Sequence, residues 1–138
     1  MQRATALALQ LCELEDVADR PAGALSTGQR RLVELARCLA GRYSILLLDE
    51  PSSGLDRAES DRFGRILQRV VEERGVGILL VEHDMALVMS VCEYIYVLDF
   101  GEPLFDGTPE EVLHADIVRA AYLGEESVEM AVIEEQVA

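Results

Sequence analysis

Residues 45–51 read Ile-Leu-Leu-Leu-Asp-Glu-Pro, and this stretch decides the fold. Its four aliphatic residues are continuous rather than alternating with polar ones, which is typical of a strand buried on both faces of a parallel sheet. A second run, residues 78–81, has the same character and ends in Glu82 and His83. Both runs therefore predict short parallel strands, each followed by charged residues.

Helical patterns lie on either side of these strands. Their apolar residues recur at helical spacing, over residues 4–19, 28–40, 56–73, 85–92 and 116–123. Residues 94–98 and 103–105 predict a hairpin at one edge of the sheet, and Thr108 predicts the N-cap of a helix, with Pro109 in its first turn and Glu111 three residues on. The alternation of helix and buried strand indicates the α/β class.

Composition excludes several classes of function. The 138 residues carry 12 basic and 26 acidic side chains, a net charge of −14, which argues against a nucleic-acid partner. All the basic residues are arginines. No apolar run approaches the roughly 20 residues of a membrane span, and no secretory signal is visible, so a cytosolic protein is expected. Three scattered cysteines, Cys12, Cys38 and Cys92, predict buried reduced thiols rather than a metal site.

Residues 25–29, Leu-Ser-Thr-Gly-Gln, come immediately before a predicted helix. A hydroxyl-bearing, glycine-containing turn at a helix N-terminus leaves free backbone N–H groups that suit a phosphate. The alternative is an ordinary N-cap formed by Ser26 or Thr27.

Carboxylates and a histidine come directly after the two predicted strands. Asp49 and Glu50 follow the first strand and His83 the second, where α/β sheets bind ligands. One carboxylate could hold Mg²⁺ and the next could orient or deprotonate a water; the alternative is a strand that leaves the core through charged residues. In residues 52–56, Ser-Ser-Gly-Leu-Asp, Asp56 could serve a site, cap the next helix, or do both.

Taken together, the four segments resemble the ATPases of the ATP-binding-cassette (ABC) family over roughly residues 4–124. Residues 25–29 resemble its signature motif, residues 45–50 its Walker B strand, residues 53–56 its D-loop, and His83 its switch histidine. Thr27 stands where the family usually has glycine. The resemblance implies a partial P-loop NTPase (RecA-like) parallel sheet flanked by helices, with the end of the ABC helical subdomain at the N-terminus.

In the family, ATP lies between two subunits packed head to tail. The resemblance implies that Asp49 orients Mg²⁺, that Glu50 is the general base for the hydrolytic water, and that His83 contacts the γ-phosphate. The signature residues would serve the nucleotide of the partner subunit, and Asp56 would communicate across the interface. These signature residues are Ser26, Thr27, Gly28 and Gln29.

The family's phosphate-binding loop, Gly-x-x-x-x-Gly-Lys-Ser/Thr, is absent, and the chain contains no lysine at all. We therefore expect residues 1–27 to be the end of the helical subdomain, residues 28–124 the C-terminal part of the ATPase core, and residues 125–138 an acidic tail. The chain alone is expected to be inactive without the missing half. The strand that leads into the phosphate loop would lie beside strands 45–48 and 78–81, so these are expected to have unpaired edges and uncovered apolar faces.

Residues 81–85, 107–112 and 121–124 are similar to the ATPase subunits of branched-chain amino-acid importers. That resemblance implies an importer ATPase on the inner face of the cell membrane, bound to transmembrane permease subunits. ATPases of lipopolysaccharide export and urea import remain alternatives. So does a different class of function, a non-catalytic module that docks on a partner ATPase.

Overall fold

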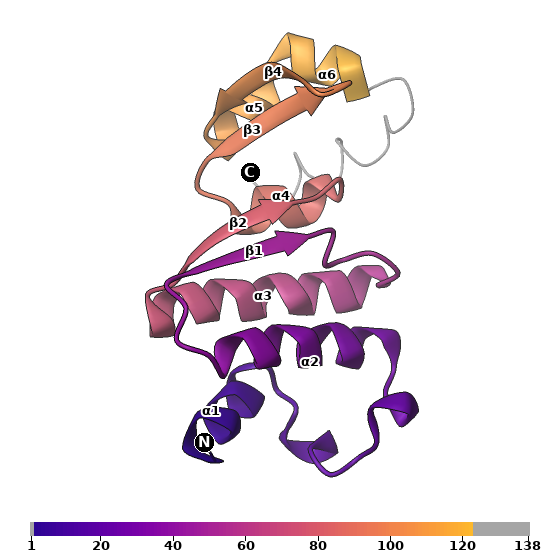
Figure 1. Ribbon diagram of the computed structural model, residues 1–138. Coiled ribbons are helices and arrows are strands. Elements are labelled where there is room, and N and C mark those ends of the chain that lie inside the picture. The colour runs from indigo at the N-terminus through magenta and orange to yellow at the C-terminus, as the bar shows by residue number, and fades with distance from the viewer. Residues whose placement is uncertain (1, 123–138) are drawn as a thin grey trace. The chain divides into compact units, whose positions relative to one another are not determined.

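The structure, a computed structural model, describes residues 2–122 of the chain. The chain divides into two compact units, Met1–Leu87 and Val88–Ala138 (Figure 1). The tail expected at residues 125–138 lies outside the described residues. Residues 2–122 include no helix that has both the length and the hydrophobicity of a membrane span.

The first unit has helices on one side of a two-stranded parallel sheet. Its elements are α1 (Gln2–Leu11), the short 3-10 helices Glu15–Val17 and Ala22–Ala24, α2 (Thr27–Leu39), β1 (Ile45–Asp49), α3 (Arg57–Arg74) and β2 (Gly77–Val81). The strands pair in register from Ile45 opposite Gly77 to Asp49 opposite Val81. The α/β class and the parallel pair predicted from the two aliphatic runs are thus confirmed.

The core of the first unit lies between the sheet and the helices, with α3 between the sheet and α2 (Figure 1). Apolar side chains at helical spacing on α2 and α3 meet Leu46 from the inner face of β1. The largest fully buried side chains of this unit are Leu14, Ile66, Leu67, Val70 and Cys12. The apolar spacing in the sequence therefore correctly predicts the buried faces of these two helices.

The opposite face of the sheet is exposed. Ile45 and Leu47 of β1 are 64% and 74% exposed, and Leu79 and Val81 of β2 are 58% and 56% exposed. The expectation of an uncovered apolar face is correct. The expectation about the edges was only half right, because β1 and β2 pair directly with each other and one edge of each strand is therefore satisfied.

The predicted helix over residues 4–19 is wrong in its second half. α1 ends at Leu11, and Glu13 takes a positive φ of 55° that breaks the helical path. The turn allows both Cys12 and Leu14 to enter the core, at 0% and 1% exposure. Burial raises the pKa of the Cys12 thiol to about 12. Burial of the other two cysteines was overestimated, since Cys38 is exposed and Cys92 half-buried.

The second unit contains an antiparallel hairpin and short helices. Helix α4 (Met85–Val91) begins in the first unit and ends in the second. The elements that follow it are β3 (Ile95–Asp99), β4 (Glu102–Gly107), α5 (Pro109–His114) and α6 (Asp116–Tyr122). The hairpin turns at Phe100 and Gly101, both at positive φ as a two-residue turn requires. Thr108 forms the predicted capping box with Glu111. Among the described residues, this hairpin is a sheet of its own rather than an edge of the β1–β2 sheet.

Candidate functional site

Glu50 and His83 come together at the C-terminal edge of the parallel sheet. The ladder ends with Asp49 opposite Val81, so the residues that follow the two strands emerge side by side. The N–H of Glu50 donates to the carbonyl of Val81 at 2.8 Å, which extends the pairing by one residue. His83 Nδ1 lies 3.8 Å from Glu50 Oε1, and both side chains are exposed, at 72% and 56%. The register thus places a carboxylate and an imidazole where both can face a ligand.

The backbone turns sharply at Glu50. Its φ is 43°, a left-handed value that side-chain-bearing residues rarely adopt. The carbonyl of Glu50 then accepts a hydrogen bond from Ser53 N at 3.1 Å, and Gly54 supplies a second left-handed residue at φ 81°. Strained backbone of this kind costs on the order of 1 kcal/mol or more and is common at functional sites. Here the turn follows β1 directly, at the residue that carries the candidate carboxylate.

Asp49 is the last residue of β1 and is exposed. Its carboxylate is the hard oxygen donor that Mg²⁺ prefers. Among the described residues, no three His, Cys, Asp or Glu side chains gather closely enough to hold a metal by themselves. The carboxylate of Asp49 is compatible with Mg²⁺, which commonly takes one or two protein carboxylates and fills its other positions with water and phosphate oxygens.

The loop that resembles the signature motif begins α2. Ser26 is the N-cap: its Oγ accepts from Gln29 N at 3.2 Å, and Gln29 Oε1 accepts from Ser26 N at 3.0 Å. Gly28 is buried, and a Cβ there would lie 2.6 Å from Glu59 Oε1. Ser26 therefore has its ordinary capping role, and its hydroxyl satisfies one backbone N–H of the first turn, that of Gln29. This cap does not exclude a ligand at the other N–H groups.

Asp56 is the N-cap of α3. Its Oδ1 accepts from Glu59 N at 2.8 Å, and Glu59 Oε2 accepts from Asp56 N at 3.2 Å. The capping alternative for Asp56 is thus confirmed. A second role of Asp56 in the site stays a prediction.

The signature-like and D-loop-like segments lie side by side. Gly54 approaches Thr27, whose Cγ2 would lie 3.6 Å from a Cβ at position 54. Arg31 of α2 donates to the carbonyl of Ser53 at 3.4 Å and pairs with Glu34 at 3.3 Å. In Figure 1 the N-terminal ends of α2 and α3 and the C-terminal ends of β1 and β2 lie on the same side of the first unit. All the site residues predicted from the sequence therefore lie at or near one edge.

Two contributors were missed by sequence reasoning. Arg31, on α2, donates a hydrogen bond to the D-loop-like turn. In the sequence it is marked only by its position, one turn into the helix that follows the Ser-x-Gly segment. Glu82 is the more consequential, because its side chain is fully buried between the loops that follow β1 and β2. In the sequence it is marked only by its position between an aliphatic strand and the candidate histidine, which does not show that the carboxylate is buried.

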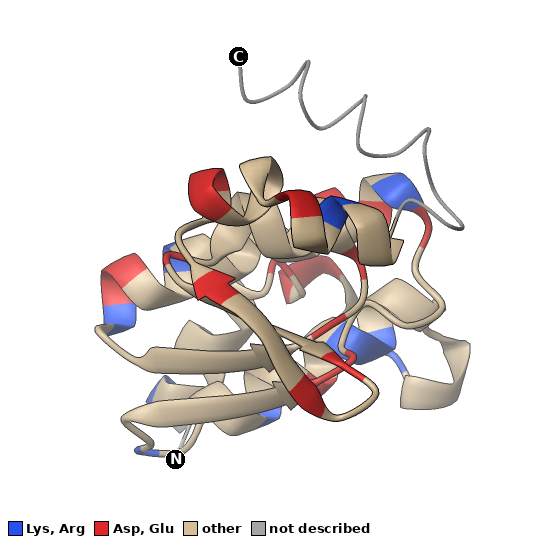
Figure 2. Ribbon diagram, turned by 90° about the horizontal axis from the view of Figure 1, so that it is seen from above, with Lys and Arg blue, Asp and Glu red and all other residues tan. Residues whose placement is uncertain are grey.

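Acidic residues end or follow the strands of the first unit, and Figure 2 draws all acidic residues in red. After β1 and β2 they are Asp49, Glu50, Glu82 and Asp84. Carboxylates alone repel a polyphosphate, so a ligand of that class also needs cations. The chain has no lysine, so its only cationic side chains of this kind are arginines, and Arg31 lies near this edge.

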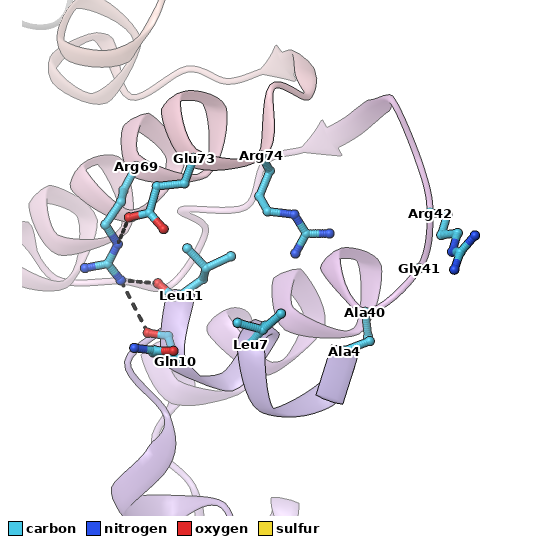
Figure 3. Close-up of a pocket in the computed structure, with 10 residues that line it drawn as sticks. All are labelled: Ala4, Leu7, Gln10, Leu11, Ala40, Gly41, Arg42, Arg69, Glu73 and Arg74. Atoms are coloured by element: carbon cyan, nitrogen blue, oxygen red, sulfur yellow. Dashed lines mark hydrogen bonds and ion pairs between the residues drawn. The ribbon is translucent and has the colours of Figure 1, made fainter. Parts of the chain in front are cut away.

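A separate cavity of about 500 Å³ lies at the other edge of the first unit (Figure 3). Gly41 and Arg42, which precede β1, line it together with Arg74, which precedes β2. Arg69 donates to the carbonyls of Gln10 and Leu11 at the end of α1, and Arg74 donates to the carbonyl of Leu39 at the end of α2, at 3.3 Å. The two arginines thus hydrogen-bond to carbonyls at helix C-termini, a favourable position for positive charge. We ascribe the cavity to this packing rather than to a ligand.

Known proteins that are similar to this chain are ATP-binding proteins of ABC transporters. Residues 1–53 match the family model described as ABC transporter. The branched-chain amino acid transport ATP-binding protein BraF of Pseudomonas aeruginosa is 45% identical over 117 residues, which cover 85% of this chain and 46% of BraF. The lipopolysaccharide export ATP-binding protein LptB of Escherichia coli is 36% identical over 113 residues, covering 82% of this chain and 46% of LptB.

Solved structures agree. The ADP conformation of MJ1267, an ATP-binding cassette of an ABC transporter, superposes with a TM-score of 0.78 at 27% identity, covering 89% of this chain and 50% of that one. The chain is therefore related to the ATP-binding proteins of ABC transporters, and the resemblance inferred from its motifs is confirmed. It spans about half the length of the curated relatives it matches.

Proposed function

We propose that the chain is the C-terminal part of an ATP-hydrolysing, nucleotide-binding subunit of an ABC importer for branched-chain amino acids. The observation that carries the proposal is the pairing of Glu50 with His83, 3.8 Å apart at the edge where the parallel strands end. A carboxylate and an imidazole in contact at this edge can act on one water and one phosphate, whereas either residue alone has many structural uses.

The roles follow the family's arrangement. Glu50 takes the proton of the attacking water and His83 contacts the γ-phosphate, while Asp49 holds Mg²⁺ through its carboxylate or through water. Mg²⁺, when bound, neutralises charge on the phosphate oxygens. These residues contribute orientation and proton acceptance, which are the protein's main tasks in phosphoryl transfer.

The other half of the site serves a partner. Ser26, Thr27, Gly28 and Gln29 at the start of α2 bind the nucleotide held by a second ATPase subunit, packed head to tail, and Asp56 communicates across that interface. The free N–H groups at the N-terminus of α2 and its dipole support this assignment. In this arrangement residues 1–27 are the end of the helical subdomain and residues 28–124 are the C-terminal part of the ATPase core.

The lysine-bearing phosphate loop has to come from a segment other than these 138 residues, since none of them is lysine. Backbone N–H groups and a lysine supply most of the affinity for the phosphates in proteins of this kind. The chain alone is accordingly proposed to be inactive, and to need ATP, Mg²⁺ and the phosphate-loop half together. The assembled enzyme would sit on the inner face of the membrane through its permease subunits.

The experiment combines the chain with the half of BraF that it does not cover, either fused or in trans. Mg-ATP hydrolysis is expected in the combination and in neither half alone. Hydrolysis that stays absent although the two halves form a stable complex would contradict the proposal. It would instead favour the second candidate, a non-catalytic module that docks on a partner ATPase.

The solute is proposed from the relatives' names. BraF is named for branched-chain amino acid transport and is more similar to the chain than LptB is, at 45% against 36% identity. Vesicles that contain the assembled ATPase and a branched-chain amino-acid permease should take up labelled leucine when ATP is present inside. Stimulation by a lipopolysaccharide-export permease and not by this one would favour the export alternative.

A further inference from the structure

Glu82 joins the two loops that carry Glu50 and His83. Its side chain is 0% exposed. One carboxylate oxygen, Oε1, accepts the N–H of Ser52 at 2.8 Å, in the loop after β1. The other, Oε2, accepts the N–H groups of His83 at 3.1 Å and Asp84 at 3.4 Å, in the loop after β2. Each oxygen thus serves a different loop.

A buried carboxylate is costly unless donors surround it. Three backbone N–H groups offset that cost here, and hydrogen bonds to a charged acceptor are about twice as strong as neutral ones. Because the donors are backbone atoms, the carboxylate fixes the course of the main chain rather than the position of a mobile side chain. Ser52, itself only 8% exposed, lies two residues after Glu50.

A second carboxylate secures the same loop from the other side. Asp84 Oδ2 accepts from the hydroxyl of Ser60 on α3 at 2.7 Å, and Asp84 Oδ1 accepts from Leu87 N at 3.1 Å. The segment that bears His83 is therefore held to α3 and to the loop after β1 at once. In contrast, the Glu50 and His83 side chains are mostly exposed, so their packing alone does not hold them in place.

We infer that Glu82 is a positioning residue, which keeps the loop of Glu50 and the loop of His83 in a fixed relation. Glu82 contacts no substrate atom; it acts through Ser52, His83 and Asp84. This inference rests on the proposed ATPase function for its catalytic consequence, although the structural link between the loops stands apart from it.

Two variants separate the geometry from the charge. Glu82→Gln keeps the length but replaces one acceptor oxygen by an NH₂ group, so one of the two loops loses its partner. Glu82→Asp keeps both oxygens but is shorter by one C–C bond, about 1.5 Å, and cannot reach both loops. Glu72→Gln is the matched control, because it removes a carboxylate from an exposed position of α3.

Amide hydrogen exchange on the full chain tests the link itself. In Glu82→Gln and Glu82→Asp, exchange at Ser52, His83 or Asp84 should become roughly tenfold faster, while the amides of the β1–β2 ladder keep their wild-type rates. Glu72→Gln should match the wild type throughout. Wild-type rates at all three amides, or a uniform acceleration across the chain, would overturn the inference.

Kinetics of the chain combined with the phosphate-loop half test the consequence. Both Glu82 variants should lower kcat by about 10-fold to 100-fold, the usual effect of misplacing reacting groups, and leave the KM for ATP within a factor of about three. A kcat no lower than that of Glu72→Gln would overturn the positioning role. Absence of activity in the wild-type combination would instead refute the proposed function, and the exchange measurement would still decide whether Glu82 links the loops.

Discussion

His83 Nδ1 lies 3.8 Å from Glu50 Oε1, although the two residues follow different strands. The contact is a consequence of register. Asp49 stands opposite Val81 in the ladder, so the next residues along each strand leave the sheet at the same point. A shift of one strand by one residue would turn every side chain on it to the other face, and this pair would separate.

The chain by itself should not bind ATP appreciably. Its candidate site offers carboxylates, one histidine and Arg31, which is engaged by Ser53 and Glu34, and the sequence has no lysine for a phosphate loop. Equilibrium binding with Mg-ATP should give no saturation up to about millimolar concentration, where the binding free energy is only about 4 kcal/mol. A micromolar dissociation constant would show that the described residues suffice and would contradict the expectation.

The exposed face of the sheet should make the isolated chain associate with itself or pack loosely. Leu47 and Leu79 are 74% and 58% exposed on adjacent strands, and covering such a side chain is worth about 1.5–3 kcal/mol. The double variant Leu47→Thr, Leu79→Thr keeps strand-favouring residues and should weaken self-association in sedimentation by at least about tenfold.

The control for that variant lies on the same strand. Leu46 points into the core at 5% exposure, so Leu46→Thr should lower the free energy of unfolding by about 2–5 kcal/mol without reducing association. If the wild-type chain is a dilute monomer with a sharp cooperative unfolding transition and binds no hydrophobic dye, the exposed face has no such effect.

Much of the fold was predictable because several signals agreed along the chain. The aliphatic runs at residues 45–48 and 78–81 identified the strands, and apolar spacing identified the buried faces of α2 and α3. The Thr108 capping box was readable from Thr, Pro and Glu at fixed offsets. Local patterns of this kind determine local structure directly.

The errors arose where tertiary contacts override local pattern. Apolar residues continue at helical spacing past Leu11, yet the chain breaks at Glu13 so that Leu14 can be buried. Nothing in the sequence distinguishes a buried Glu82 from an exposed one, because its N–H partners come from another loop. The positions of Asp49, Glu50 and His83 were predicted; their chemical roles stay predictions.

Glu13 should make stability depend on pH. Hydrogen bonding from Arg62, at 2.8 Å, lowers the pKa of Glu13 below its ordinary value of 4.5, and Arg69 adds to the effect. A carboxyl with a lowered pKa stabilises the fold fully above that ordinary value and loses its contribution as pH falls through the lowered pKa.

The measurement is urea unfolding of the wild type and of Glu13→Gln at about pH 7 and about pH 3. The wild type should be the more stable at the higher pH, and the difference between the two proteins should shrink at the lower one. The side chain is 43% exposed, so solvent screening keeps the effect modest. An equal difference at both pH values would mean that the ion pairs of Glu13 contribute nothing.

Glu50 is proposed as the general base of an ATPase site that a phosphate-loop half completes. The most direct measurement is the rate of ATP hydrolysis by that combination with Glu50→Gln, compared with the wild type and with Glu72→Gln. Glutamine keeps the shape but cannot accept the proton, so kcat should fall by about 10²–10⁴-fold while ATP-bound dimers accumulate. Hydrolysis by Glu50→Gln at the wild-type rate would contradict the account.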